Sequence, residues 1–169
     1  MVKVKNLAYT VLVIFLVSVL LGCVGTRETK LEPKAEGKPL YDYITKGNNY
    51  KSWNKWPGTG ELYSRSPGSP HGDFLTTYVS DNAFSAIQSK KGSLPDESII
   101  VKENYDANKT LAALTVMYKE DGYDPGNNDW FWAKYGTDGS VQVEGKVNGC
   151  IDCHVKQKEN DYTFSGPLK

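Results

Sequence analysis

The sequence contains few cysteine, histidine and methionine side chains, and it has no excess of charge of either sign. Among its 169 residues there are three cysteines, two histidines and two methionines. Lys plus Arg and Asp plus Glu number 20 each, which gives a formal net charge of zero. A balanced charge gives no support for nucleic-acid binding. The length, without internal repeats or a low-complexity core, suits one globular domain with short extensions.

The pronounced hydrophobic run of the sequence lies at the N-terminus and is short. Lys3 and Lys5 precede an almost unbroken apolar run over residues 7–21. This run is shorter than the roughly 20 residues of a membrane-spanning helix, and a basic start followed by an apolar stretch is typical of an export signal. The sequence therefore predicts export.

The end of this run, Leu20-Leu21-Gly22-Cys23, resembles the lipobox of bacterial and archaeal lipoproteins. The resemblance implies that residues 1–22 form a signal peptide, that cleavage occurs before Cys23, and that the Cys23 thiol receives a lipid. The alternative is an uncleaved signal anchor with an incidental cysteine. Both readings place the domain at a membrane and outside the cytoplasm, in the cell envelope or periplasm.

The segment after Cys23 has the composition of a flexible tether. Residues 25–40 are dominated by Lys, Glu, Thr, Pro and Gly and show no apolar periodicity, and such a segment cannot bury its side chains. We expect a lipidated tether over residues 23–40 and a folded domain over residues 41–169.

The rest of the chain alternates short apolar segments with turn residues. Residues 41–56 space their aromatic side chains loosely as in a helix, and residues 57–73 are rich in Pro, Gly and Ser, which indicates loop or a loosely held strand. β-Branched and aromatic residues predict strands at 73–80, 98–105, 109–120 and 130–136, and helical spacing predicts a helix over 82–92. Neighbours joined by short turns favour the α+β class, mainly an antiparallel sheet with a few helices.

Two of the three cysteines belong to a Cys-x-x-Cys-His motif near the C-terminus. In an exported protein, Cys150 and Cys153 followed by His154 predict one c-type haem, with both thiols attached as thioethers to the haem vinyl groups and the histidine as proximal iron ligand. With Cys23 lipidated, every cysteine has a role. The alternatives are a redox disulfide and half of a zinc site, although zinc would need ligands beyond His71 and scattered carboxylates.

A sixth iron ligand would have to come from His71 or Met117, the other histidine and the only methionine apart from the initiator. His71 lies between Ser-Pro and Gly-Asp in a loop and is expected to be an exposed turn residue. Met117 lies within a predicted apolar strand, where core packing is expected. We therefore predict a five-coordinate iron with an open side that can bind small molecules.

The order of these segments resembles the cytochrome P-460 family and its relative cytochrome c-prime-beta. The resemblance spans roughly Tyr43 to the C-terminus. It is carried by FLTTYVSDNAFSAI (74–87), LPDESIIVKE (94–103), MYKEDGYDPGNNDWFWAKYGTDG (117–139) and GCIDCH (149–154). It implies a small, β-rich, exported haem protein, usually a homodimer, with its haem motif near the C-terminus.

The resemblance also assigns a role to a lysine. In catalytic members of the family a lysine is cross-linked to a meso carbon of the haem and favours hydroxylamine oxidation, and Lys102 matches that position. The alternative for Lys102, which precedes Glu103 in a strand, is a solvated face with a weak ion pair. Catalytic members also carry a distal carboxylate. The matching stretch offers Tyr118 instead, with Glu120 nearby, and this departure argues against hydroxylamine chemistry.

Three functions remain open at this point. The favoured one is a membrane-tethered, mono-haem cytochrome that transfers electrons with a redox partner protein or binds a small nitrogen ligand such as nitric oxide. The second is a hydroxylamine oxidoreductase with a Lys102 cross-link, and the third is a haem-free module with a disulfide. The aromatic residues expected in the pocket wall or the core are Phe74, Tyr78, Phe84, Trp130, Phe131 and Trp132.

Overall fold

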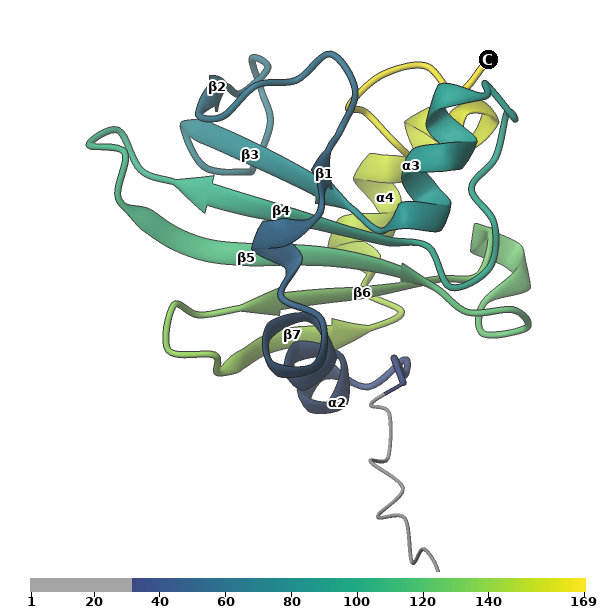
Figure 1. Cartoon of the computed structure of the whole chain (residues 1–169), viewed down its shortest axis with the longest axis horizontal. Helices are drawn as coiled ribbons and strands as arrows, with labels where there is room; N and C mark the ends of the chain where they lie inside the picture. Colours follow the sequence, from purple (N-terminus) through teal and green to yellow (C-terminus); the bar gives the residue numbers. More distant parts are fainter. Residues whose placement is uncertain (1–31) are drawn as a thin grey trace, which may run out of the picture. The chain divides into compact units, whose positions relative to one another are not determined.

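The computed structural model of the protein describes residues 32–169 (Figure 1). The predicted signal peptide and Cys23 lie outside the described residues. Over residues 32–169, the model has no helix of the length and apolar character needed to cross a membrane.

The folded domain is built on one antiparallel sheet of seven strands. Six strands follow the order β1-β3-β4-β5-β6-β7, and β2 pairs with β3 beside β1. The strands are β1 Asn54–Lys55, β2 Tyr63–Ser64, β3 Phe74–Val79, β4 Ile99–Tyr105, β5 Leu111–Lys119, β6 Trp130–Tyr135 and β7 Val141–Gly145. The predicted α+β class, with a mainly antiparallel sheet, is confirmed, because sequential strands pair through short connections from β4 to β7.

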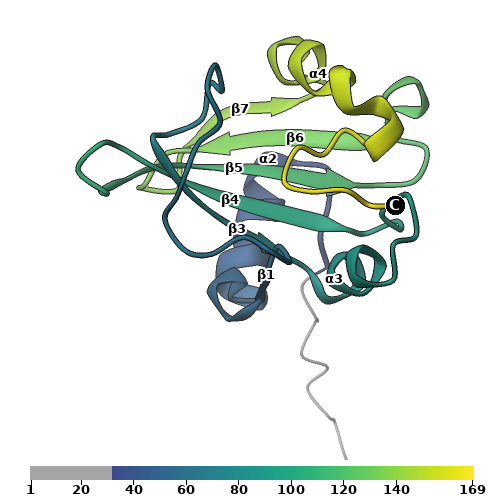
Figure 2. The same ribbon diagram turned by 90° about the horizontal axis from the view of Figure 1, so that it is seen from above.

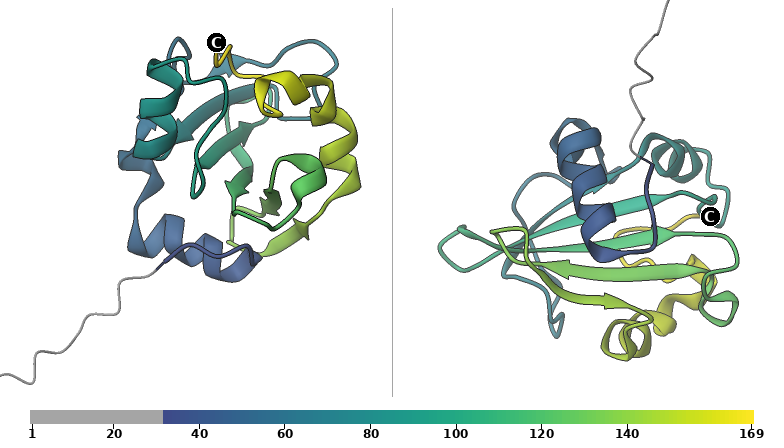
Figure 3. Two further views of the ribbon diagram at one scale, coloured as in Figure 1. Left: turned by 90° about the vertical axis from the view of Figure 1, so that its right-hand side faces the viewer. Right: turned by 90° about the horizontal axis from the view of Figure 1, so that it is seen from below.

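Short helices cover both faces of this sheet. They are α2 Gly37–Asp42, α3 Asp81–Gln88 and α4 Asn148–His154, together with the helical turns η1 Tyr43–Gly47, η2 Tyr50–Ser52, η3 Pro125–Asn127 and η4 Val155–Asn160. Helix α4 and the C-terminal segment pass over one face of the central strands, and α2 lies on the opposite face (Figures 2 and 3). The helix predicted over 82–92 is therefore present as α3, and the haem motif lies on α4.

The alternation of side chains along the central strands separates two cores, because successive residues of a strand point to opposite faces of its sheet. One core joins Ile99 and Val101 of β4 to Leu40 and Ile44 of the N-terminal helical turns. The other joins the opposite face of the sheet to α3 and to the C-terminal segment. The site described below lies on this second face.

The first described residues join the domain earlier than predicted. Helix α2 begins at Gly37, and Leu40 is completely buried. Just before the helix, the backbone N–H of Ala35 donates to Glu120 Oε2 over 2.9 Å. The boundary expected after residue 40 lies several residues too late, because Ala35 and Leu40 pack on the hydrophobic face of the sheet and the Tyr135 hydroxyl donates to the Gly37 carbonyl over 2.8 Å.

Candidate haem site

Helix α4 brings the three residues of the motif onto one side of a single helical turn. Residues three and four positions apart lie on the same helix face, so Cys150 lies on one face with Cys153, three positions later, and with His154, four positions later. Both cysteines are half-buried free thiols, and His154, the last residue of α4, is only 9% exposed. The structure therefore places two free thiols and one imidazole on the same short helix.

A backbone carbonyl fixes the orientation of the His154 ring. His154 Nδ1 lies 2.7 Å from the Tyr162 carbonyl oxygen, and because a carbonyl can only accept, Nδ1 carries the proton. Nε2 keeps its lone pair for a metal. In metal-binding histidines, the nitrogen that does not bind the metal usually donates to a protein oxygen in this way. The ring also lies 4.7 Å from the Trp132 ring and 5.3 Å from the Phe164 ring, between centroids.

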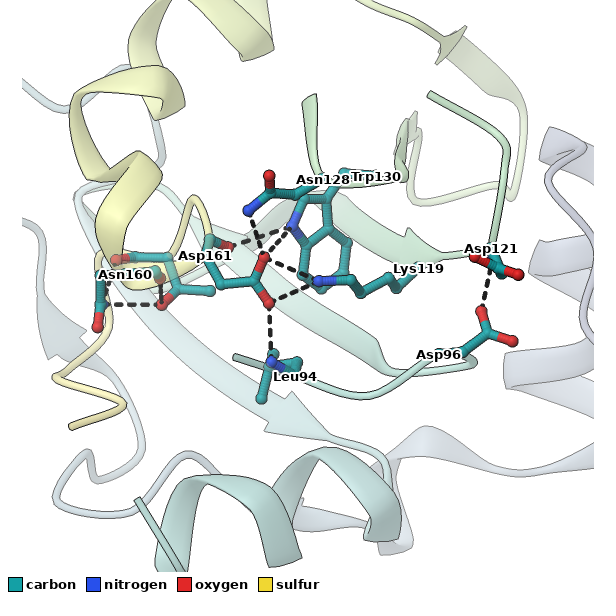
Figure 4. A network of polar contacts seen from close by, with 9 residues as sticks. Leu94, Asp96, Lys119, Asp121, Asn128, Trp130, Asn160 and Asp161 are labelled. Atoms are coloured by element: carbon teal, nitrogen blue, oxygen red, sulfur yellow. Dashed lines mark hydrogen bonds and ion pairs between the residues drawn. The ribbon is translucent and has the colours of Figure 1, made fainter. Parts of the chain in front are cut away.

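The segment that carries the Tyr162 carbonyl is held by the buried carboxylate of Asp161 (Figure 4). The Lys119 ammonium donates to both of its oxygens over 2.7 and 2.8 Å, the Leu94 N–H donates over 2.8 Å, and the Asn128 amide donates over 3.0 Å. Tyr162 itself has a φ of 63°, a left-handed conformation that is uncommon for a bulky residue and needs support from its surroundings. The Asp161 network supplies that support.

The following turn is closed by the Asn160 side chain. Its amide nitrogen donates to the carbonyls of Thr163 and Gly166 over 2.8 and 2.9 Å, and its oxygen accepts from the Leu168 N–H over 2.8 Å. The Trp130 indole N–H donates to the Asp161 carbonyl over 3.1 Å. The C-terminal residues are thus fastened to the sheet, and Phe164 is kept beside His154.

Two cavities meet at His154. The smaller, of about 200 Å³, is reached by Cys150, and the larger, of about 450 Å³, by Cys153. Volumes of this order are typical of pockets for small molecules and cofactors. The residues that line both cavities are His71, Lys102, His154, Phe164 and Ser165.

Lys102 lies on the cavity side of β4 and not on a solvated face. Burial lowers the pKa of its amine from 10.5 to about 8, and within residues 32–169 no hydrogen bond or ion pair holds the amine. Glu103 lies on the opposite side of the sheet, where its buried carboxylate accepts from the Tyr50 and Tyr105 hydroxyls over 2.8 and 2.6 Å. The alternative of a solvated Lys102 paired with Glu103 is therefore wrong.

His71 is also a cavity residue, so the expectation of an exposed turn histidine is wrong. It is half-buried, its Nδ1 lies 3.0 Å from Asn104 Oδ1, and its ring centroid lies 6.3 Å from that of His154 with the planes at 88°. Burial is the main cause that lowers the pKa of His71 to about 4. The imidazole is thus neutral at pH 7.

Met117 is buried and lines the smaller cavity, although it also packs in the core of that face. Tyr118, the next residue, points to the opposite core, as the alternation of a strand requires. Glu120 follows the end of β5 and lines neither cavity. Neither residue can therefore replace a distal carboxylate. No aspartate or glutamate of the described chain lines the two cavities.

Of the six aromatic residues expected in the wall or the core, only Trp132 lines a cavity. Tyr78 and Phe131 belong to the core on the other face. Phe164 was not predicted, because its position depends on the C-terminal turn that the Asp161 carboxylate fastens to Leu94 and Lys119, which are far away in the sequence.

The donor set and the walls fit a covalently bound haem. Two thiols and an imidazole nitrogen point from one helix toward the cavities, of which the smaller has largely apolar walls and the larger has more polar ones. Lys134 lines the smaller cavity and Lys156 the larger one, and these cations complement the anionic propionate groups of a haem. The site residues thus agree with the cofactor that the motif predicts.

Comparison with known proteins agrees with this geometry. The model of the family described as Cytochrome P460 matches residues 48–165, a segment that contains His71, Lys102 and the whole Cys-x-x-Cys-His motif. No curated protein matches the chain. Since the family match covers most of the sequence, the chain belongs to the cytochrome P460 family and is a haem-binding cytochrome.

Proposed function

We propose that the protein is a mono-haem c-type cytochrome, tethered to a membrane by a lipid on Cys23, which transfers electrons or binds small nitrogen ligands such as nitric oxide. The observation that carries the proposal is helix α4, which presents the Cys150 and Cys153 thiols and the free Nε2 of His154 at the junction of two cavities. When bound, the haem would supply one-electron iron chemistry and a site for diatomic ligands.

Each residue of the site has a separate task in this function. Cys150 and Cys153 would attach to the vinyl groups and prevent dissociation of the haem, and His154 would bind the iron. Trp132 and Phe164 limit access of water to the His154 ring. The bond from His154 Nδ1 to the Tyr162 carbonyl increases the electron density on the imidazole and so favours the ferric iron.

The cellular setting follows from the predicted lipoprotein signal. A domain anchored through Cys23 would act outside the cytoplasm, in the cell envelope or periplasm. Its partners would be a redox protein or a small nitrogen compound, and the family resemblance adds a homodimer.

The test is intact mass and absorption of the full chain produced with a c-type haem maturation system. We expect the mass of one covalently bound haem and a reversible change of the spectrum on reduction. A variant with Cys150→Ala and Cys153→Ala should lose the covalent haem, and Asp152→Ala, on the exposed side of the same helix, is the matched control. A colourless protein in which the two cysteines form a disulfide would contradict the proposal.

A second function is favoured by Lys102, namely hydroxylamine oxidation with a lysine cross-link to the haem. The amine lines both cavities and has a pKa of about 8, which makes it a better nucleophile near neutral pH than an ordinary lysine. Formation of the bond from the lysine nitrogen to a meso carbon of the haem would break one N–H bond and one C–H bond. The two protons and two electrons released would pass to a peroxide oxidant. The absence of a carboxylate from the cavity walls of the described chain weighs against turnover.

The same samples distinguish the two functions. A cross-linked wild type should be two hydrogens lighter than the simple adduct and should have a red-shifted ferrous Soret band, and both features should vanish in Lys102→Ala but persist in Lys134→Ala. Identical, ordinary c-type spectra in all three proteins would leave Lys102 as a pocket residue and the electron-transfer or ligand-binding function in place.

A further inference from the structure

We infer that His71 is the sixth ligand of the iron, so that the resting haem is held between two histidines and its distal side is closed. This inference rests on the proposed attachment of haem at α4. It replaces the open, five-coordinate iron that the sequence predicts. The argument has three steps: the loop that carries His71, the hydrogen bond that fixes its ring, and its position relative to His154.

The loop between β2 and β3 is pressed against β4 at the residue next to His71. A side chain at Gly72 would overlap the backbone of Tyr105, so only glycine allows this close approach. The Gly72 N–H also lies 3.3 Å from Asn104 Oδ1, and the His71 N–H lies 3.3 Å from Ser69 Oγ. His71 is therefore carried on a loop that is fixed to the sheet.

Asn104 fixes the ring of His71 in turn. The Asn104 side chain is buried, and its amide nitrogen donates to the Lys102 carbonyl over 2.9 Å, to Thr115 Oγ1 over 3.1 Å and to the Ala113 carbonyl over 3.3 Å. Because these three groups accept hydrogen bonds, the amide atom that faces them is the nitrogen, and the amide atom that faces His71 is the oxygen. Because that oxygen only accepts, His71 Nδ1 carries the proton and Nε2 has the free lone pair.

The two histidines of the site therefore have the same support. In each, Nδ1 donates to an oxygen of the protein, and Nε2 is left free for a metal. A hydrogen bond from the ring nitrogen that does not bind the metal accompanies nearly all metal-binding histidines. A histidine that served only to fill space would not need a buried asparagine whose orientation is set by three other bonds.

The distance between the rings suits a shared metal. Bonds from a metal to imidazole nitrogen are about 2 Å long, so two imidazoles on opposite sides of one ion have ring centroids about 6 Å apart. The centroids of His71 and His154 are 6.3 Å apart, and their planes are at 88°. Two axial imidazoles can have their planes parallel or crossed, and both arrangements keep the nitrogens directed at the ion.

The other candidate ligands are less suitable. Met117 lines only the smaller cavity and packs in the core. Lys102 lines both cavities, but no hydrogen bond within the described part of the chain orients its amine. His71, by contrast, lines both cavities and has a ring whose orientation is fixed by a hydrogen bond to Asn104.

A closed distal side changes the expected function of the site. Nitric oxide or hydroxylamine would have to displace His71 before it could bind the iron, whereas electron transfer needs no open coordination position. The inference therefore favours electron transfer among the proposed functions.

The test is the spin state of the ferric protein after covalent haem has been confirmed by intact mass. Absorption and electron paramagnetic resonance spectra should show a low-spin, six-coordinate haem in the wild type. His71→Ala should be high-spin, and added imidazole should restore the low-spin spectrum. Met117→Ala and Lys102→Ala should remain low-spin and serve as matched controls for the other two candidate ligands.

Two further variants protect the test against misfolding. His71→Gln keeps a polar side chain of similar size and should also become high-spin, and Asn104→Leu should give a mixture of spin states because the ring loses its hydrogen bond. A high-spin wild type, or a low-spin His71→Ala whose spectrum changes only when Lys102 or Met117 is replaced as well, would overturn the inference. A protein without bound haem would overturn the proposed function itself, and the mass measurement separates that outcome from the others.

Discussion

Lys102 and Glu103 are neighbours in the sequence but lie in unrelated environments, because β4 separates them onto two faces of the sheet. Glu103 is fully supplied with donors by Tyr50 and Tyr105, and its negative charge is one of the causes that raise the pKa of both tyrosines, after burial. Lys102 has no such support. Its burial therefore costs free energy at neutral pH, and a buried amine with a lowered pKa beside a cavity is a candidate functional residue.

This cost gives a prediction for the haem-free chain. The pKa of Lys102 falls from 10.5 to about 8 on folding, and one pKa unit corresponds to about 1.4 kcal/mol, so the charged form costs up to about 3 kcal/mol at pH 7. Lys102→Met should raise the free energy of unfolding by up to this amount. Above pH 8 the folded protein releases the proton while the unfolded chain keeps it, so wild-type stability rises with pH and the difference shrinks toward pH 10.5.

Urea unfolding at pH 7 and near pH 10 measures this difference. Lys134→Met is the control, because Lys134 is exposed and its replacement should change stability little. A Lys102→Met variant that is no more stable than wild type at pH 7 would show that the amine is solvated through the cavities.

At the scale of elements, the site depends on two segments that press against the sheet: the loop that carries His71 and the C-terminal segment that carries the Tyr162 carbonyl. The second is organised by Asp161, whose carboxylate replaces the hydrogen bonds that a strand or helix would provide. Because α4 ends at His154 and the carbonyl lies eight residues later, the orientation of the imidazole is set by tertiary contacts.

Asp161→Ala tests this dependence. Removal of one partner of a buried ion pair costs about 3 to 5 kcal/mol, and Lys119 would be left without its acceptor. We also expect the reduction potential of the haem-loaded protein to rise, because a weaker bond from His154 Nδ1 reduces the electron density on the imidazole. Asp161→Asn keeps the shape of the side chain, so its stability and its reduction potential should lie between those of the wild type and those of Asp161→Ala.

Unfolding experiments measure the loss of stability, and a redox titration measures the change of the reduction potential. A variant that loses stability but keeps the wild-type potential would show that the network supports the fold without positioning His154. Glu159→Ala, an exposed carboxylate in the same turn, should alter neither quantity and is the control.

The sequence was sufficient for the elements whose pattern is local. β-Branched and aromatic residues predicted β3 to β6, helical spacing predicted α3, and the Cys-x-x-Cys-His spacing predicted the residues that the structure brings together on α4. The surroundings of His71 could not be predicted, because Asn104 lies 33 residues away and a proline- and glycine-rich loop indicates exposure. A glycine directly after the histidine was the one local sign of a close approach to the sheet.

At the scale of the whole molecule, we expect the two cores to differ in how far they depend on the cofactor. The face under α2 is closed by the chain itself, with Leu40, Ile44 and Tyr135 completely buried. The opposite face has a core of its own and also contains both cavities, which we expect a haem to fill. The fold is therefore expected to be firm on one side of the sheet and to depend on the cofactor on the other.

Hydrogen exchange of the haem-loaded wild type and of the haem-free Cys150→Ala, Cys153→Ala variant tests this asymmetry. Without haem, water fills the cavities and the residues that line them lose apolar contacts, so we expect the haem-free variant to be less stable. The amides of α4 and of residues 155–163 should exchange faster without haem, since local opening becomes easier where packing is lost. The amides of α2 and η1 should be nearly unchanged, because their contacts are made on the other face. Equal loss of protection on both faces would mean that the haem supports the whole fold, and no loss at all would mean that α4 packs firmly without it.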